Sequence, residues 1–106
     1  MQTGICLRIY LSESDSIQHA PALEAILGLC QQAGLQGVSV LRGIEGLGKH
    51  GVHSASFLEL SSSLPLVVEV IDTEEKIHHA LPLIQEQLPS ALIATWPIQL
   101  IQKPTE

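Results

Sequence analysis

The chain has 106 residues, the length of one small domain, and its 45% apolar and 15% charged composition argues against disorder. Its formal net charge of −6 disfavours nonspecific binding to nucleic acids, which proteins bind through clusters of Lys and Arg. The apolar stretches are shorter than a membrane span, and the N-terminus lacks the basic start and apolar core of a signal peptide. We therefore expect a single cytoplasmic domain over residues 1–106 that neither binds nucleic acid nor inserts into a membrane.

The first part of the chain carries patterns for a strand, a helix and a second strand. Residues 5–11, ICLRIYL, place four aliphatic side chains on one face by alternation, which predicts a strand with one core face. Residues 21–33 have an apolar stripe at helical spacing, with Pro21 suited to the first turn and Gly34 to the C-terminal stop. Residues 37–44, GVSVLRGI, return to alternation and predict the second strand.

The next strand and helix follow after residue 65. Residues 66–71, LVVEVI, are apolar on both faces apart from Glu69, which is typical of a central strand. Thr73 is suited to cap a second helix, and the acidic residues after it suit the positive end of the helix dipole. Pro82 lacks an amide donor, and we expect it to interrupt or kink this helix.

The last strand completes a recognisable order of elements. Residues 91–101, ALIATWPIQLI, predict a strand whose Pro97 prefers a sheet edge, and residues 54–60, SASFLEL, offer a short additional strand. The order strand, helix, strand, strand, helix, strand predicts an α+β, ferredoxin-like βαββαβ sandwich with an antiparallel sheet. Right-handed crossovers would place both helices on one face of that sheet.

The opposite face of the predicted sheet is too apolar to be left to solvent. Arg8 and Glu69 lie on neighbouring strands in this arrangement, and we expect them to pair across the sheet. An apolar face of this kind suggests that another subunit covers it. The residues that we expect on it are Cys6, Arg8, Tyr10, Val67, Glu69 and Ile71. Cys6 and Cys30 have no metal or redox spacing and are expected to be buried, reduced thiols.

The second strand runs into a glycine-rich segment, residues 42–53, RGIEGLGKHGVH. Glycines let successive amides approach an anion closely, and Lys49 adds a positive charge. The dinucleotide and P-loop motifs both require a helix directly afterwards, whereas the residues after Gly51 have strand or loop character. Taken alone, the segment therefore favours a flexible loop without a phosphate-binding role.

The pattern of residues 7–75 resembles a known family. The runs LRIYLSESD, GLQGVSVLRGIEGLGKHGVHSA and LSSSLPLVVEVIDTEEKI are similar to the domain of unknown function 190 group of the PII-like superfamily. The stretch from Leu41 to Gly48, followed by His53, is the most specific part. The resemblance implies ferredoxin-like protomers assembled as a homotrimer around their sheets, with a mobile loop at about residues 46–64.

The resemblance also implies a ligand site and a signalling role. PII-like regulators bind nucleotides in clefts between protomers, and their loop engages or releases a partner protein. Residues 46–49 are similar to the step at the base of that loop, where Gly48 would offer its amide and Lys49 would meet a phosphate. The ligand-binding residues expected on this basis are Arg42, Gly43, Glu45, Gly46, Gly48 and Lys49.

The basic half of a PII nucleotide site is missing from this chain. The segment before the last strand, PSALIATWP, contains neither glycine nor lysine, and the tail IQKPTE lacks paired arginines. Arg42, Lys49 and Lys103 remain to compensate phosphate charge. Tight ATP binding is therefore not expected, and an adenine nucleotide with fewer phosphates, or no nucleotide, fits these charges better.

The sequence also bears on two other classes of function, metal binding and catalysis. His50 and His53 are three residues apart on the predicted loop, and a trimer would present three such pairs, so a divalent transition metal is the alternative ligand. The chain contains no asparagine, which acyl phosphatases of similar fold use, and its serines lack a histidine and acid in recognisable order. We therefore expect a noncatalytic regulatory module without catalytic residues.

Overall fold

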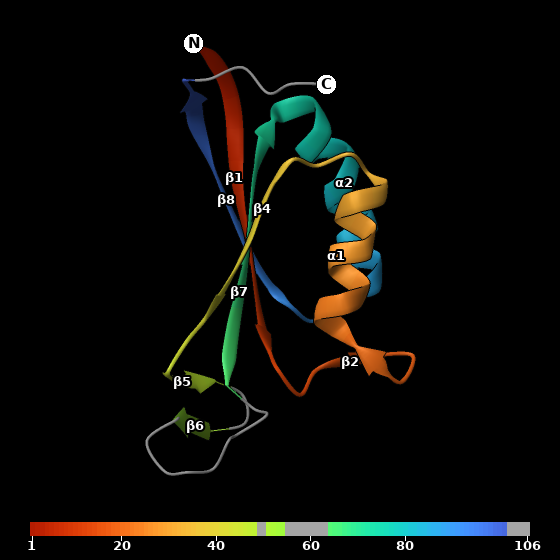
Figure 1. The fold of residues 1–106 in the computed structure, drawn as a ribbon, viewed down its shortest axis with the longest axis vertical. Helices are drawn as coiled ribbons and strands as arrows, with labels where there is room; N and C mark the ends of the chain where they lie inside the picture. The colour runs from red at the N-terminus through yellow and green to blue at the C-terminus, as the bar shows by residue number, and fades with distance from the viewer. Residues whose placement is uncertain (49–50, 55–63, 102–106) are drawn as a thin grey trace.

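The computed structural model describes residues 1–48, 51–54 and 64–101. In this part of the chain, four antiparallel strands form the main sheet, and two short hairpins accompany it (Figure 1). The sheet has the order β4-β7-β1-β8, with β1 at Gln2–Ser12, β4 at Gly37–Arg42, β7 at Pro65–Thr73 and β8 at Leu92–Leu100. The helices are α1 at Ala22–Gln32 and α2 at Glu74–Gln87. The hairpins pair β2 at Ser16–Ile17 with β3 at Ala20–Pro21, and β5 at Glu45–Gly48 with β6 at Gly51–Ser54.

This arrangement confirms the predicted ferredoxin-like order. Strand β7 is central, as its two apolar faces indicated, and β8 is an edge strand, where Pro97 needs no ladder partner on its open side. Both helices lie on the same face of the sheet, to the right in Figure 1. The extra strand expected at residues 54–60 falls mostly outside the described residues, since β6 ends at Ser54.

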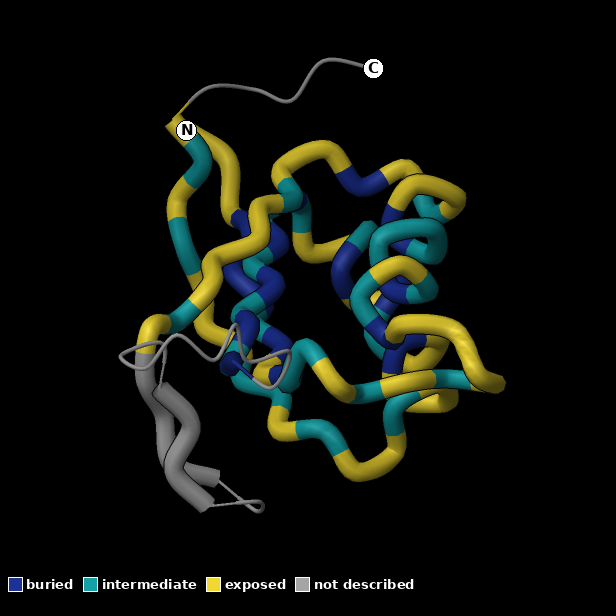
Figure 2. The backbone as a smooth tube through the Cα atoms, turned by 60° about the horizontal axis from the view of Figure 1, so that its bottom comes forward, coloured by how far each residue is buried: buried dark blue, intermediate teal, exposed yellow. Residues whose placement is uncertain are grey.

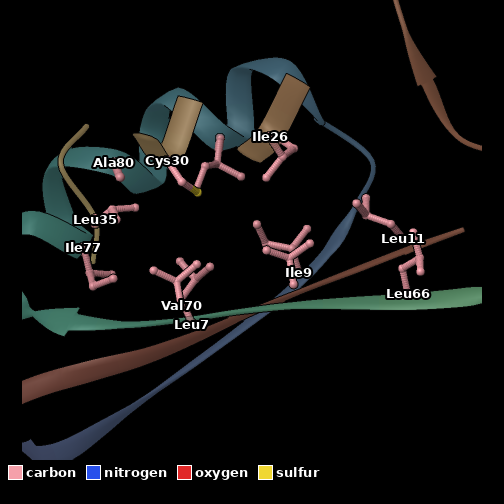
Figure 3. Packing of buried hydrophobic residues seen from close by; sticks show 12 residues of the cluster. Leu7, Ile9, Leu11, Ile26, Cys30, Leu35, Leu66, Val70, Ile77 and Ala80 are labelled. Carbon is pink, nitrogen blue, oxygen red and sulfur yellow. The ribbon is translucent and has the colours of Figure 1, made fainter. Parts of the chain in front are cut away.

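The core lies between the helices and one face of the sheet. Burial is concentrated where β1 and β7 face the helices (Figure 2), because alternate residues of these strands point inward. Figure 3 shows aliphatic side chains from both helices meeting those of the strands. The buried cluster contains Leu7, Ile9, Leu11, Ile26, Cys30, Leu35, Leu66, Val68, Val70, Ile77, Ala80 and Ile84.

Helix α1 ends as the sequence predicts. Gly34 has φ +75°, a left-handed conformation that side chains with a Cβ rarely adopt. The amide of Leu35 donates to the carbonyl of Cys30 at 3.0 Å, and that of Gly34 to Gln31 at 3.1 Å. These two bonds form a Schellman motif, which satisfies the last carbonyls of the helix.

Helix α2 confirms one prediction and corrects part of another. Its start is as expected, because the Thr73 hydroxyl accepts a hydrogen bond from the amide of Lys76 at 3.3 Å. Pro82, however, does not interrupt the helix, which continues to Gln87. The proline leaves only the carbonyl of His78 without its usual donor, and both residues are exposed, so water can serve that carbonyl.

The hairpin of β2 and β3 was not predicted from the sequence. Its two turn residues, Gln18 and His19, have φ values of +50° and +69°. Positive φ at both central positions is typical of the type I′ hairpin turn, and Asn and Gly adopt this conformation most readily. Because neither Asn nor Gly occupies these two positions, the sequence carries no signal for this turn.

Candidate functional site

The predicted ligand segment begins where three strand ends meet. Strand β4 ends at Arg42, opposite Leu66 near the start of β7, and β1 ends at Ser12, opposite Pro65. The β5–β6 hairpin follows β4 directly at this end of the sheet (Figure 1). We call the residues Ser12, Glu13, Arg42, Gly43 and Pro65 the loop base.

Gly43 serves strand packing at the loop base. Its amide donates to the carbonyl of Pro65 at 2.8 Å, so this donor is already used within the protein. A Cβ at position 43 would lie 2.8 Å from Cγ of Pro65, which is closer than ordinary contacts allow. The glycine is therefore needed for the close approach of the chain to β7, and a role in ligand binding stays a prediction.

Arg42 is held by an acidic residue that sequence reasoning did not single out. Its Nε lies 3.0 Å from Oε2 of Glu13, and its Nη2 donates to Oε1 of the same carboxylate at 3.1 Å. The Arg42 side chain remains 57% exposed and that of Glu13 23% exposed. Arg42, which the sequence predicts to bind phosphate, is thus paired with a carboxylate in this structure.

The remaining predicted ligand residues lie on or beside the β5–β6 hairpin. The backbone register pairs Glu45 with Ser54, Gly46 with His53 and Gly48 with Gly51. This pairing brings Gly46, Gly48 and His53 onto one small hairpin. Lys49 and His50, the other two predicted site residues, lie outside the described part of the chain.

The metal hypothesis gains no support from the described residues. Within that part of the chain, no group of three or more His, Cys, Asp or Glu side chains is arranged to hold a metal ion. His53 is described by its backbone only, and His50 is not described. Binding of a transition metal by these two histidines therefore stays a prediction.

The sheet face away from the helices carries a second cluster of functional groups, which we call the uncovered face. Arg8 and Glu69 pair across β1 and β7, with Nε–Oε2 and Nη2–Oε2 distances of 2.9 and 2.8 Å, which confirms the predicted pair. The Arg8 guanidinium also lies over the ring of Trp96, 5.5 Å from its centroid. The hydrogen bond to Glu69, and then that to Tyr10, raise the pKa of Arg8, which therefore stays charged.

The two cysteines are buried free thiols, as predicted. Cys6 points to the uncovered face, where Ile71 and Trp96 flank it on the neighbouring strands, and Cys30 belongs to the core. Burial raises the pKa of both thiols, and for Cys6 the charge of Glu69 adds to this effect while Arg8 opposes it. Both groups are therefore poor nucleophiles.

Comparison with solved structures defines the class of fold. The chain is similar to CPII, a nitrogen regulatory PII-like protein from Thiomonas intermedia K12 that was solved bound to ADP, AMP and bicarbonate. The likeness covers 94% of this chain and 90% of CPII, with a TM-score of 0.68 and 18% identity. The protein therefore has a PII-like fold.

Sequence comparison then gives the family. The model of the DUF190 family, described as "Uncharacterized ACR", matches residues 4–100, and the chain belongs to this family. A UPF0166 protein of Aquifex aeolicus is 43% identical over 72 residues, which are 67% of this chain and 69% of that protein. A UPF0166 protein of Methanocaldococcus jannaschii is 35% identical over 80 residues, covering 76% and 74% of the two chains. The resemblance seen in residues 7–75 is thereby confirmed.

No described helix is long and apolar enough to cross a membrane.

Proposed function

We propose that this protein is a noncatalytic PII-like regulator that binds an adenine nucleotide in clefts between the protomers of a homotrimer. The observation that carries this proposal is the fold, shared over 94% of the chain with a PII-like protein solved with ADP and AMP. Residues 46–64 follow β4 in the chain, as the partner-binding loop of a PII-like regulator follows its second strand. We assign them the same signalling role.

The uncovered face supports the trimer. It presents large apolar side chains to solvent in the single chain, among them Tyr10, Leu41, Leu92 and Trp96. A contiguous apolar surface of this kind is usually covered by a partner. The Arg8–Glu69 pair neutralises the charges in its midst, so this face can be buried against other copies of the chain without leaving an unpaired charge.

The charges near the loop base limit the ligand to few phosphates. Arg42 is the cation at this end of the described chain, because Arg8 lies within β1 beside Glu69 and Lys76 lies in the first turn of α2. Lys49 would add one more positive charge. Two cations per protomer match ADP or AMP better than ATP, since an uncompensated phosphate charge is costly inside a cleft.

The proposal is tested by thermal unfolding of the purified protein with AMP, ADP and ATP. A ligand that binds only the folded state raises the midpoint of unfolding, and we expect ADP to do so. Lys49→Ala should abolish the shift, whereas Lys76→Ala, which removes an equal charge from the first turn of α2, should keep it relative to its own baseline.

The same assay separates the metal hypothesis. A shift with zinc or copper that His50→Ala or His53→Ala abolishes, together with no shift from any nucleotide, would contradict the nucleotide proposal. A nucleotide shift that Lys49→Ala leaves unchanged would contradict the assigned site.

A further inference from the structure

Glu13 and Arg42 bridge two strands that do not touch each other. Strand β7 lies between β1 and β4, and the ion pair spans its first residues. The backbone of Glu13 is fixed independently of its side chain, because its amide donates to the carbonyl of Leu64 at 3.0 Å. The main chain at the end of β1 therefore holds Glu13 within reach of Arg42 whether or not the two side chains are paired.

The geometry of this pair is the geometry with which arginine binds phosphate. Two nitrogens of the guanidinium face two oxygens of one carboxylate, at 3.0 and 3.1 Å. Arginine uses this planar, two-pronged arrangement for carboxylates and phosphates alike. A phosphate that binds Arg42 through this edge must therefore displace Glu13.

The pair is exposed enough to be displaced. With Arg42 57% and Glu13 23% exposed, water and salt screen the attraction. Exposed ion pairs of this kind contribute little to stability, so opening the pair does not unfold the loop base.

We propose that Glu13 is a specificity-determining residue, which competes with the phosphates of the ligand for Arg42 and thereby favours nucleotides with few phosphates. This inference rests on the proposed nucleotide site and deepens it. Once displaced, the carboxylate remains at the loop base and repels each further phosphate. Its effect on affinity therefore grows from AMP to ADP to ATP.

The test is calorimetric titration of AMP, ADP and ATP into the wild type and Glu13→Gln. We expect the variant to bind ADP about two- to fivefold more tightly, the range set by the strength of an exposed ion pair. The gain should be smallest for AMP and largest for ATP. Glu86→Gln, which removes an equal charge from the exposed surface of α2, should leave all three affinities unchanged.

A second background separates competition from simple repulsion. In Arg42→Ala, the competition is absent and only the repulsion between Glu13 and the phosphates remains, so adding Glu13→Gln should raise ADP affinity by less than it does in the wild type. An equal gain in both backgrounds would overturn the inference, because Glu13 would then act without Arg42. Glu13→Asp keeps the charge but shortens the side chain, and we expect an intermediate gain for ADP.

The outcomes distinguish this inference from the function on which it rests. If the wild type binds ADP and Glu13→Gln binds all three nucleotides with unchanged affinity, the inference alone is overturned. If no variant binds any adenine nucleotide while circular dichroism shows them folded, the proposed function and the inference both fail.

Discussion

Asp72 shows how much one buried carboxylate contributes to this fold. Its side chain is 1% exposed, at the end of β7. One oxygen accepts the amide of Gln36 at 2.9 Å, and the other accepts that of Thr73 at 2.8 Å. Asp72 thereby ties the connection between α1 and β4 to the start of α2.

Asp72→Ala should lower the free energy of unfolding by about 2–4 kcal/mol, because two amides lose a charged acceptor and part of their surroundings is buried. Asp72→Asn keeps one carbonyl acceptor and should cost about half as much. Urea unfolding followed by circular dichroism measures both, with exposed Glu86→Gln as the control. A loss below about 0.5 kcal/mol for Asp72→Ala would show that the two hydrogen bonds are dispensable.

The thiols of Cys6 and Cys30 lead to a prediction on pH. Burial raises both pKa values in the folded state, so the stability that comes from keeping the thiols neutral is fully present below the ordinary thiol pKa. It is lost as the pH rises through the raised values. We expect the free energy of unfolding to fall above about pH 8.5, and Cys6→Ser/Cys30→Ser to remove this part of the decline.

The same burial should make both thiols slow to react with a disulfide reagent at pH 8. In denaturant, labelling should become fast and should reach two thiols per chain. Rapid labelling of either cysteine in the native protein would contradict the structure at that position.

At the scale of single residues, the contacts that follow from strand alternation could be predicted from the sequence. The Arg8–Glu69 pair was predictable. Alternation along each strand places both side chains on the uncovered face, and the two strands were expected to be neighbours. The roles of Asp72 and Glu13 were not predictable. The partner Gln36 of Asp72 lies in the connection between α1 and β4, and the partner Arg42 of Glu13 lies on a strand that is not adjacent to β1. Only the folded chain brings these groups together.

The end of helix α1 offers a matched pair of glycines at the scale of an element. Gly28 lies within the helix, and a Cβ there would meet no atom within 4 Å, whereas Gly34 has φ +75°. Gly28→Ala should stabilise the protein by about 0.5–1 kcal/mol through helix propensity. Gly34→Ala should destabilise it by about 1–2 kcal/mol, because alanine is strained in the left-handed conformation.

Thermal and urea unfolding of the two alanine variants give these values directly. Opposite signs are expected. A Gly34→Ala variant at least as stable as the wild type would mean that α1 does not end in the Schellman motif described above.

Regular elements were predictable where apolar residues repeat at the period of a helix or strand. The strands from residues 5–11, 37–44, 66–71 and 91–101 all appear in the sheet, with shifts at their ends. The β2–β3 hairpin was missed because Gln18 and His19 adopt positive φ without glycine or asparagine. The continuity of α2 through Pro82 was missed because solvent exposure, which lowers the cost of the lost hydrogen bond, is a property of the packed structure.

At the scale of the whole molecule, the uncovered face leads to a prediction on assembly. Tyr10 lies on this face and is 38% exposed, while Leu83 lies on α2 and is 42% exposed. If trimers form through the sheets, Tyr10→Asp should place a charge in the interface and shift the protein towards monomers. Leu83→Asp introduces the same charge on the helical side and should remain a trimer.

Gel filtration with light scattering measures the mass of both variants and the wild type. A monomeric wild type would rule out the trimer and the proposed site between protomers. A trimeric Tyr10→Asp variant would place the interface elsewhere on the molecule.

The order of elements determined the fold of the single chain, but the proposed ligand site depends on groups that the sequence pattern does not bring together. Residues 42–48 were recognisable by their glycines and by the family resemblance. Whether Arg42 is available to a phosphate depends on Glu13, 29 positions earlier in the chain. A cleft between protomers also depends on surfaces of separate chains, which periodicity within one chain does not specify.

Native mass spectrometry of the purified protein with and without ADP tests the central claim most directly, because it reports the assembly and its ligands together. We expect a trimer that binds up to three ADP molecules. A protein that remains monomeric, or a trimer whose mass does not change with ADP, AMP or ATP, would contradict the proposal of a nucleotide-binding PII-like regulator.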